Sequence, residues 1–349
     1  MGARTQDAAP ALLSEDELAL INALQLSPRA SWTELGRALD VDPVTVARRY
    51  RRLSAQGAAW VGFSPGPRLL EQICVAYVVI DCAPGTTAEV ARTLGAHPHM
   101  VTIERTATGH DLLATVATRD LAALSRYALD RLPHLPGITA VRSRVVTHMF
   151  TEGGRWRIAA LAPAQRARLA APPAPPDTAA RTAGATPVDR ALVAHLAHDG
   201  RIPYQTLARQ LGVSLSTAKR RIEHLTRGGL LRFRCDFARP LGGWPVAVTF
   251  WAKVPPADLP HVGQSLIRLP ETRNCAAVSG PENLVLQATL HSPADIIRLE
   301  SQLVTAHPAL DIADRVVTLR QDKLLGRLLD PYGRSTGVVP ADLWAEPAL

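Results

Sequence analysis

Apolar residues recur at helical spacing over the first sixty residues and predict three short helices. Leu18, Ile21 and Leu24 share one face of a helix that Ser14 and Glu17 would begin as a capping box. Asp42 followed by Pro43 is typical of the start of another helix, which Gly57 would end. The second and third helices take their apolar stripes from Trp32, Leu35, Leu39, Val46, Tyr50 and Leu53.

The hydrophobic period then changes, and strands alternate with helices as far as about residue 150. The predicted strands are 74–82, 101–107, 112–118 and 138–149, and the predicted helices are 86–96 and 120–132. The order β-α-β-β-α-β is that of the ferredoxin-like split βαβ unit.

The whole pattern occurs twice. Positions 172 apart match without a gap, and farther along Arg144-Val145-Val146-Thr147 matches Arg315-Val316-Val317-Thr318 at an offset of 171. The first set of matches is Leu24, Arg29, Leu35, Arg37, Leu39, Val41, Thr45, Arg48, Arg49, Leu53 and Gly57 with Leu196, Arg201, Leu207, Arg209, Leu211, Val213, Thr217, Arg220, Arg221, Leu225 and Gly229. The period exceeds the roughly 20–50 residues of solenoid repeats, so the sequence indicates a duplicated two-part module.

We therefore predict an α+β protein, a tandem repeat of a winged helix-turn-helix domain and a ferredoxin-like β-α-β-β-α-β (RAM-type) domain. A lone four-stranded sheet leaves one face partly apolar, so the two ferredoxin-like domains should pair, within one chain or by a swap between chains. The expected segments are a disordered 1–13, helix-turn-helix domains at 14–66 and 187–240, ferredoxin-like domains at 67–155 and 241–322, an Ala/Pro-rich linker at 163–186, and a tail at 323–349 with a short helix and an extended arm.

Composition excludes several classes of protein. No stretch approaches the roughly 20 apolar residues of a membrane span, and the N-terminus has no apolar signal core. The four cysteines are scattered without a CxxC pair, which favours reduced thiols in a cytoplasmic protein over a zinc site or disulfides. No motif of a catalytic, metal or cofactor site is present, so we expect neither enzyme activity nor a bound cofactor.

Charge points to a polyanionic partner. The net charge is +8 with a pI near 9.8. Residues 188–236 hold nine arginines and lysines against four acids, whereas residues 14–60 hold six of each. The two copies are therefore not expected to be equivalent.

The second three-helix segment has the features of a DNA-binding helix-turn-helix. Tyr204 to Leu211 predicts a short support helix that ends at Gly212, and Ser214 caps a helix whose outer face is basic and hydroxylic. The predicted DNA-binding residues are Ser214, Ser216, Thr217, Lys219, Arg220, Arg221, Arg227 and Arg232. The alternative is a three-helix bundle with a solvated basic face.

The first copy gives a weaker signal for double-stranded DNA. Its candidate contacts are Val44, Thr45, Arg48, Arg49 and Arg52. Asp40 and Asp42 flank the turn where phosphates would approach, so a purely structural role stays open.

The stretch from Asp199 to Leu230, followed by a β-α-β-β-α-β domain, resembles the leucine-responsive/asparagine regulator (Lrp/AsnC) family, in its double-length form. The resemblance implies DNA binding by the helix-turn-helix, and homo-oligomerisation and sensing of an amino-acid-like effector by the ferredoxin-like domain. It places the effector at a Gly-x-x-Asp-like loop after the second strand. In this sequence the loop residues are Thr108, Gly109, His110 and Asp111, and in the second copy Ser279, Gly280 and Asn283.

The two loops differ at their acidic position. Asp111 would accept an ammonium group, whereas Asn283 offers a neutral amide, so an amino-acid-like ligand should prefer the first copy. Alternatively, both glycines serve hairpin geometry only.

Two other functions stay open. The same architecture is similar to siroheme decarboxylases, although their Tyr/Arg/His-rich insertion between the second and third strands is missing here. A nucleoid-like protein that compacts DNA with little sequence preference is the other alternative.

Overall fold

The computed structural model describes residues 10–107, 109–169 and 186–346, so most of the expected N-terminal segment and of the linker lie outside it. The parts of those segments that it does describe are ordered against the domains. The Leu13 N–H donates to the Leu241 carbonyl at 2.8 Å, and residues 163–169 form a helix.

Local caps fix the first three-helix domain, which consists of α1 (Glu15–Leu26), α2 (Trp32–Leu39) and α3 (Pro43–Ala55). The predicted capping box is confirmed: the Glu17 N–H donates to Ser14 Oγ at 3.3 Å, and the Ser14 N–H donates to the Glu17 carboxylate at 2.9 Å. Asp42 accepts from the N–H groups of Val44 and Thr45 just before α3, as expected.

A segment that the sequence assigned partly to a linker completes the first domain. Trp156, Ile158, Leu161 and Leu169 are buried in its core, and α7 (Pro163–Leu169) packs against α1 and α2. The prediction of a linker that begins at residue 163 is therefore wrong for residues 163–169, which form α7. Their Ala-rich composition concealed Leu169, which covers apolar surface on the first domain.

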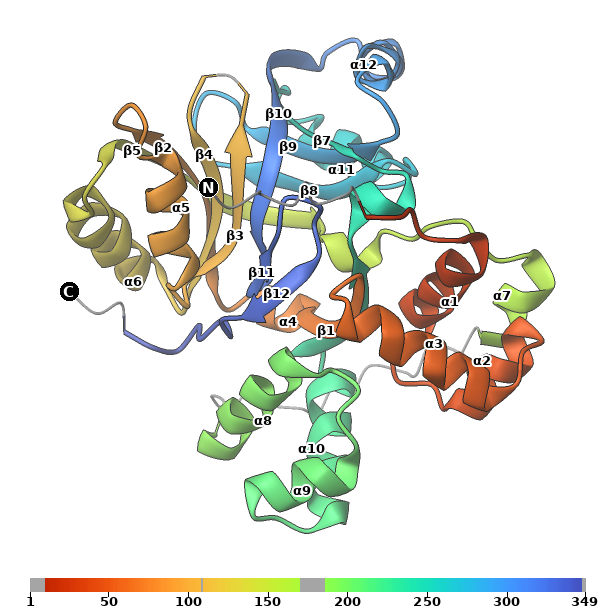
Figure 1. The fold of residues 1–349 in the computed structure, drawn as a ribbon. Coiled ribbons are helices and arrows are strands. Elements are labelled where there is room, and N and C mark those ends of the chain that lie inside the picture. Colours follow the sequence, from red (N-terminus) through yellow and green to blue (C-terminus); the bar gives the residue numbers. More distant parts are fainter. Residues whose placement is uncertain (1–9, 108, 170–185, 347–349) are drawn as a thin grey trace, which may run out of the picture.

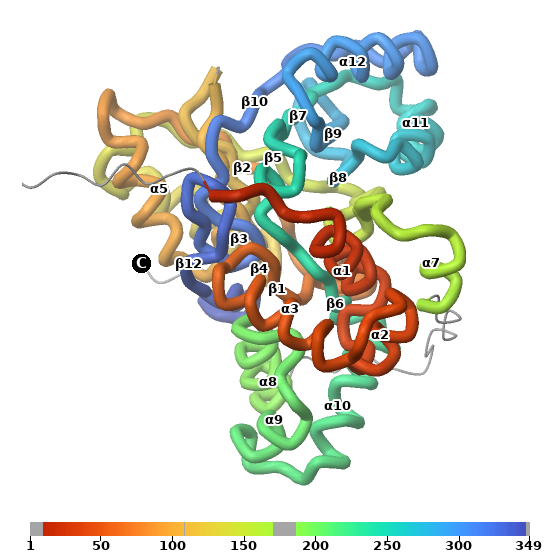
Figure 2. Tube along the Cα trace, turned by 45° about the vertical axis from the view of Figure 1, so that its right-hand side comes forward, coloured from red at the N-terminus to blue at the C-terminus, as the bar shows by residue number. Residues whose placement is uncertain are grey.

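The second three-helix domain repeats this design with α8 (Pro187–His198), α9 (Tyr204–Leu211) and α10 (Leu215–Arg227). Gly212 ends α9 with a φ of 64°, and Ser214 Oγ accepts from the Thr217 N–H at 3.1 Å, as the sequence predicts. The two wings, β1 (Ala59–Pro65) and β6 (Leu231–Phe237), pair with each other in an antiparallel ribbon. Both helical domains thus extend from one ribbon below the large sheet (Figures 1 and 2).

Each ferredoxin-like unit has the predicted order of elements. The first contains β2 (Cys74–Cys82), α5 (Thr87–Gly95), β3 (Met100–Thr106), β4 (Leu112–Thr118), α6 (Leu121–Ser125) with its π-helical continuation Arg126–Arg131, and β5 (Ile138–Thr151). The second contains β7 (Val246–Lys253), α11 (Leu259–Leu266), β8 (Thr272–Val278), β9 (Leu284–Leu290), α12 (Ala294–Ala306) and β10 (Asp311–Leu324).

The two units close into one barrel-like sheet inside a single chain. β5 pairs with β2 of its own unit and then with β8 of the other unit. β10 likewise pairs with β7 and then with β3. The expected quasi-symmetric pairing is confirmed, and it forms within the chain. Tyr77, Val79, Leu113, Trp251 and Val316 are among the residues buried between the two sheets.

The tail forms strands in place of the expected short helix. After β10 the chain forms β11 (Arg327–Leu329) and β12 (Ser335–Val338) at the edge of the large sheet. The Ser335 N–H donates to the Gly57 carbonyl at 2.8 Å, where Gly57 has a φ of 66° and no room for a Cβ. Leu343 is buried in a cluster with Val75 and Val101. The tail therefore joins the first helical domain to the barrel.

Candidate DNA-binding surface and effector cavity

The N-terminal turn of α10 presents a row of hydroxyl groups. Ser214, Ser216 and Leu215 are exposed, and the hydroxyls of Ser216 and Thr217 lie 2.9 Å and 2.8 Å from Ser214 Oγ. Ser214 thus serves the helix cap, while Ser216 and Thr217 are oriented at the end of the helix that meets base edges in helix-turn-helix proteins.

Three cations of the second domain extend freely from α10. Lys219, Arg220 and Arg227 are exposed, and none of them forms an ion pair with a described residue. The Lys219 ammonium lies 5.7 Å from the centre of the Tyr204 ring, which leaves it at the surface of the turn. These side chains are placed to neutralise phosphates.

Two predicted DNA contacts have partners inside the protein. Arg221 forms an ion pair with Asp189 of α8 at 2.9 Å, and Arg232 lies on the β1–β6 ribbon and forms one with Glu152 at 3.1 Å. Neither the run Lys219-Arg220-Arg221 nor the place of Arg232 just after the helix reveals which arginine faces an acid from another element.

In the first copy, acids of α1 bind part of the predicted surface. Arg49 pairs with Asp16 at 2.9 Å and Arg52 with Glu17 at 2.7 Å. Val44 is 69% exposed, and Arg48 is exposed without an ion-pair partner among the described residues. The side chain of Thr45 is half-buried. The free cationic surface is therefore smaller than that of α10.

The two helical domains are joined by reciprocal arginines from the repeated motif. Arg29 donates to the carbonyls of Gly200 and Ile202 at 2.5 Å and 3.1 Å, and its guanidinium lies 4.6 Å from the Tyr204 ring centre. Arg201 donates to the carbonyls of Pro28 and Ala30 at 2.6 Å each and lies 3.9 Å from the Trp32 ring centre. These contacts, the arginine clasp, fix one helical domain against the other.

The side chain at the acidic position of each predicted effector loop bonds the chain at the end of the first strand of its unit, β2 or β7. Asp111 accepts from the Cys82 N–H at 2.8 Å and from the Thr87 hydroxyl at 3.3 Å. Asn283 bonds both the N–H and the carbonyl of Val254, at 2.9 Å and 2.8 Å. Each oxygen of Asp111 thus already accepts one hydrogen bond from the protein, and its role as an acceptor for an ammonium group stays a prediction.

The other loop residues divide between structure and cavity. Ser279 bonds the backbone of Val145 on β5, and Gly280 has a φ of 111° in its turn. Gly109, with a φ of 73°, and His110 line a cavity between the two units. Thr108 lies outside the described residues.

This interface cavity has a volume of about 230 Å³ and takes its walls from both ferredoxin-like units. Its lining residues are Val79, Gly109, His110, Arg142, Arg144, Trp251, Glu282, Ala313 and Asp314. The Arg144 guanidinium lies 4.6 Å from the Trp251 ring centre and pairs with Glu282 at 2.5 Å. Arg142 pairs with Asp81 at 2.9 Å.

Charge of both signs meets at the cavity. Burial opposes ionisation of Glu282, but the hydrogen bond and charge of Arg144 prevail and lower the pKa of that carboxyl. Burial lowers the pKa of His110, whose Nε2 is buried without a partner among the described residues. The cavity thus offers guanidinium groups, carboxylates and a neutral imidazole, a set that suits a zwitterion.

Most of these cavity residues were missed from the sequence. Arg144 opens one of the two RVVT repeats, and the sequence predicted only that it lies in the strand 138–149. Its counterpart Arg315 does lie on the surface, paired with Glu300 at 2.7 Å. The repeat alone could not separate the two roles, since only the pairing of the two units places Arg144 beside Trp251.

Family models match both helical domains and one sensing domain. The AsnC-type helix-turn-helix domain matches residues 13–54 and 186–226, and the Lrp/AsnC ligand binding domain matches residues 75–156. In the part of the chain that the structure describes, no helix is long and apolar enough to cross a membrane.

Curated relatives are similar to one copy of the module. An HTH-type transcriptional regulator of Pyrococcus abyssi is 28% identical over 141 residues, which cover 39% of this chain and 86% of the relative. The HTH-type transcriptional regulator Ptr1 of Methanocaldococcus jannaschii is 24% identical over 149 residues, which cover 42% of this chain and 100% of the relative.

Among solved structures, the siroheme decarboxylase NirDL is similar to the whole chain. Its TM-score is 0.57 at 13% identity, with coverage of 93% of this chain and 95% of that one. The same enzyme in co-complex with an iron-uroporphyrin III analogue gives a TM-score of 0.57 at 14% identity, covering 89% and 93%. At such identities the likeness shows a shared tandem fold.

Proposed function

We propose that this chain binds double-stranded DNA in a sequence-specific manner and regulates transcription. It belongs to the Lrp/AsnC family of helix-turn-helix regulators and carries the module twice. The observation that carries the proposal is the exposed face of α10, where Ser216 is exposed and Lys219 and Arg220 form no ion pair with a described residue. Hydroxyls at a helix N-terminus and arginines on its outer face suit base edges and phosphates. Such a role places the protein in the cytoplasm.

The test is selection of bound fragments from the host genome. Purified protein is incubated with sheared genomic DNA in the presence of excess random DNA, and the retained fragments are sequenced. A regulator enriches a few sites with a shared motif. Retention without any enriched motif would support the nucleoid-like alternative, and no retention would contradict DNA binding.

The proposed effector is a small zwitterion of the amino-acid class, bound in the interface cavity. Its carboxylate would face Arg142 and Arg144, and its ammonium group would face Glu282 and Asp314. Trp251 would cover an apolar side chain from one side. The support is that complementary charges from two units converge on one cavity.

Calorimetric titration with the common amino acids tests this assignment. Arg142→Ala removes an arginine that is 56% exposed and should weaken binding at least tenfold, whereas Arg119→Ala, on the outer surface, should not change it. Equal affinity in both variants would place the effector elsewhere. We further expect the chain to form homo-oligomers, which light scattering of the purified protein measures.

A siroheme-decarboxylase-like enzyme is the alternative, since NirDL is similar over the whole chain. Titration with an iron-uroporphyrin separates the two functions. A regulator leaves the Soret band of the porphyrin unchanged, and a saturable shift with one site would favour the enzyme.

A further inference from the structure

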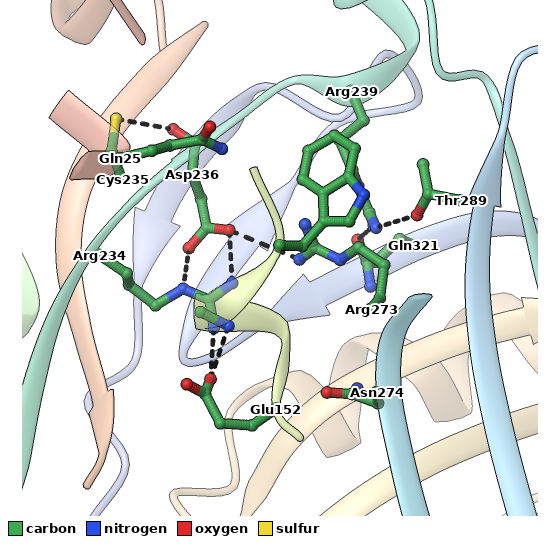
Figure 3. A network of polar contacts seen from close by, with 12 residues as sticks. Gln25, Glu152, Arg234, Cys235, Asp236, Arg239, Arg273, Asn274, Thr289 and Gln321 are labelled. Atoms are coloured by element: carbon green, nitrogen blue, oxygen red, sulfur yellow. Dashed lines mark hydrogen bonds and ion pairs between the residues drawn. The ribbon is translucent and has the colours of Figure 1, made fainter. Parts of the chain in front are cut away.

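A layer of buried and half-buried charged side chains lies between the β1–β6 ribbon and the barrel (Figure 3). It holds more guanidinium groups than carboxylates: Arg157, Arg232, Arg234, Arg239 and Arg273 face Glu104, Glu152 and Asp236. The carboxylates are already engaged. Asp236 binds Arg234 through two oxygens at 2.6 Å each, and Glu152 binds both Arg232 and Arg234.

Arg273 on β8 has no hydrogen-bond acceptor among the described residues. Its side chain is 8% exposed, and its nearest carboxylate oxygen, on Asp236, is 3.6 Å from Nη2, beyond a good hydrogen bond. The face of Trp156 covers it at 5.1 Å. Burial and the neighbouring Arg239 hold the pKa of Arg273 well below its usual value. A buried guanidinium without an acceptor is costly unless an anion completes it.

The open side of Arg273 faces a cavity of about 90 Å³, which we call the junction chamber. One water needs roughly 10–15 Å³ on a comparable measure, so the chamber has room for a small organic molecule. Its polar wall consists of Ser64, Thr102, Thr115, Glu152, Arg234, Arg273 and Asn274. The carboxylate of Glu152 is already paired with Arg232 and Arg234, so the wall keeps an excess of positive charge. Ser64 Oγ is buried and has no hydrogen-bond partner among the described residues, which gives the chamber a second unsatisfied polar group.

The rest of the wall is apolar. Ile73, Val75, Met149, Leu324 and Tyr77 are among its lining residues. The chamber therefore combines one cationic end with an aliphatic body. An ammonium group would be repelled by the excess of guanidinium groups, which separates this chamber from the interface cavity.

We propose that the junction chamber binds a small aliphatic monocarboxylate, whose carboxylate is received by the guanidinium of Arg273 and the hydroxyl of Ser64. A guanidinium presents several donors that match a carboxylate, and a cavity of about 90 Å³ admits only a short aliphatic chain. The proposal does not depend on the proposed DNA-binding function.

The chamber lies where it can link the barrel to the DNA-binding domains. Ser64 belongs to β1 and Arg234 to β6, the two strands that carry the helical domains, whereas Arg273 and Thr102 belong to the barrel. A carboxylate bound between them contacts both layers. It would therefore stabilise one placement of the ribbon on the barrel.

Calorimetric titration of the full chain with isovalerate tests the proposal, with isovaleramide as the uncharged probe of the same shape. We expect saturable binding of isovalerate and at least tenfold weaker binding of the amide. This comparison uses the unaltered protein, so it does not depend on whether a variant folds. Equal binding of the acid and the amide, or binding of neither, would overturn the proposal.

Two variants locate the site. Arg273→Met keeps much of the volume of the side chain but removes its charge, and it should weaken isovalerate at least tenfold. Arg268→Met removes an exposed arginine just before the same strand and should leave the affinity unchanged. If Arg273→Met does not fold, Ser64→Ala replaces it and should weaken binding several-fold. Unchanged affinity in the folded variant would assign isovalerate to another place.

Discussion

The two helix-turn-helix domains share one design but differ in what their arginines do. In the first, residues 156–169 close the core, and acids of α1 hold Arg49 and Arg52. In the second, Asp189 of α8 holds Arg221, whereas Lys219, Arg220 and Arg227 are exposed without an ion-pair partner among the described residues. The two copies have therefore diverged. Residues 156–169 pack on the core of the first domain, and the second domain has the larger cationic surface.

The long last strands of the two sensing units, β5 and β10, also differ in what their charged residues contact. β5 leads into Glu152, which binds arginines of β6, whereas β10 carries Lys323 at the position 171 residues later. Lys323 is fully buried and donates to the carbonyls of Gly95 and His97 at 2.9 Å each. β5 thus ties the barrel to the β1–β6 ribbon, and β10 ties the second unit to α5 of the first.

The largest expected effect is on the stability of the first domain, whose core is closed by residues 156–169. Leu169→Ala removes a buried side chain from its core, which should cost about 2–5 kcal/mol. Hydrogen exchange should then show lost protection in α1 to α3 and unchanged protection in α8 to α10. Leu192→Ala, in the core of the second domain, is the matched control and should show the reverse. Equal loss in both domains from Leu169→Ala would mean that they unfold as one unit.

Loss of the arginine clasp should have a smaller effect. It should lower the affinity for DNA by changing how the two helical domains are placed relative to each other. Arg201→Ala removes two hydrogen bonds to the first domain and should weaken binding to a two-half-site operator about tenfold, or about 1.4 kcal/mol. Arg201→Lys should not restore it, since an ammonium lacks the planar fork. The dependence of affinity on salt should stay the same. A smaller salt dependence would show instead that Arg201 contacts a phosphate.

The smallest expected effect is the contribution of Lys323 to the pH dependence of the free energy of unfolding. Burial lowers the pKa of Lys323 to about 7, below its value of about 10.4 in an unfolded chain. Between these values the unfolded state binds more protons, so stability rises with pH, by at most about 1.4 kcal/mol per pH unit. Urea unfolding at pH 7 and pH 8 should show this rise, and Lys323→Met should reduce it. Parallel pH curves for the two proteins would contradict the assignment.

Sequence reasoning was most successful where local signals decide the structure. The capping box of Ser14, the N-cap of Asp42 and the left-handed Gly212 depend on neighbours in the chain, and the duplication predicted the pairing of the two sensing units. Contacts between residues far apart in the sequence could not be predicted. The partner of Arg232 is Glu152, 80 residues away, and the partner of Arg144 is Glu282, 138 residues away. Both depend on the closed sheet, and so does the interface cavity.

The most direct test of the account is the affinity of matched variants for an operator recovered from genomic selection. Fluorescence anisotropy at one fixed salt concentration compares Lys219→Ala/Arg220→Ala with Arg48→Ala/Arg51→Ala, which removes the same number of exposed cations from the first domain. The account predicts a loss of about thirtyfold or more for the second-domain variant, near 2 kcal/mol, and only a few-fold for the other. Equal losses, or a larger loss from the first domain, would contradict the claim that the second helix-turn-helix carries DNA binding.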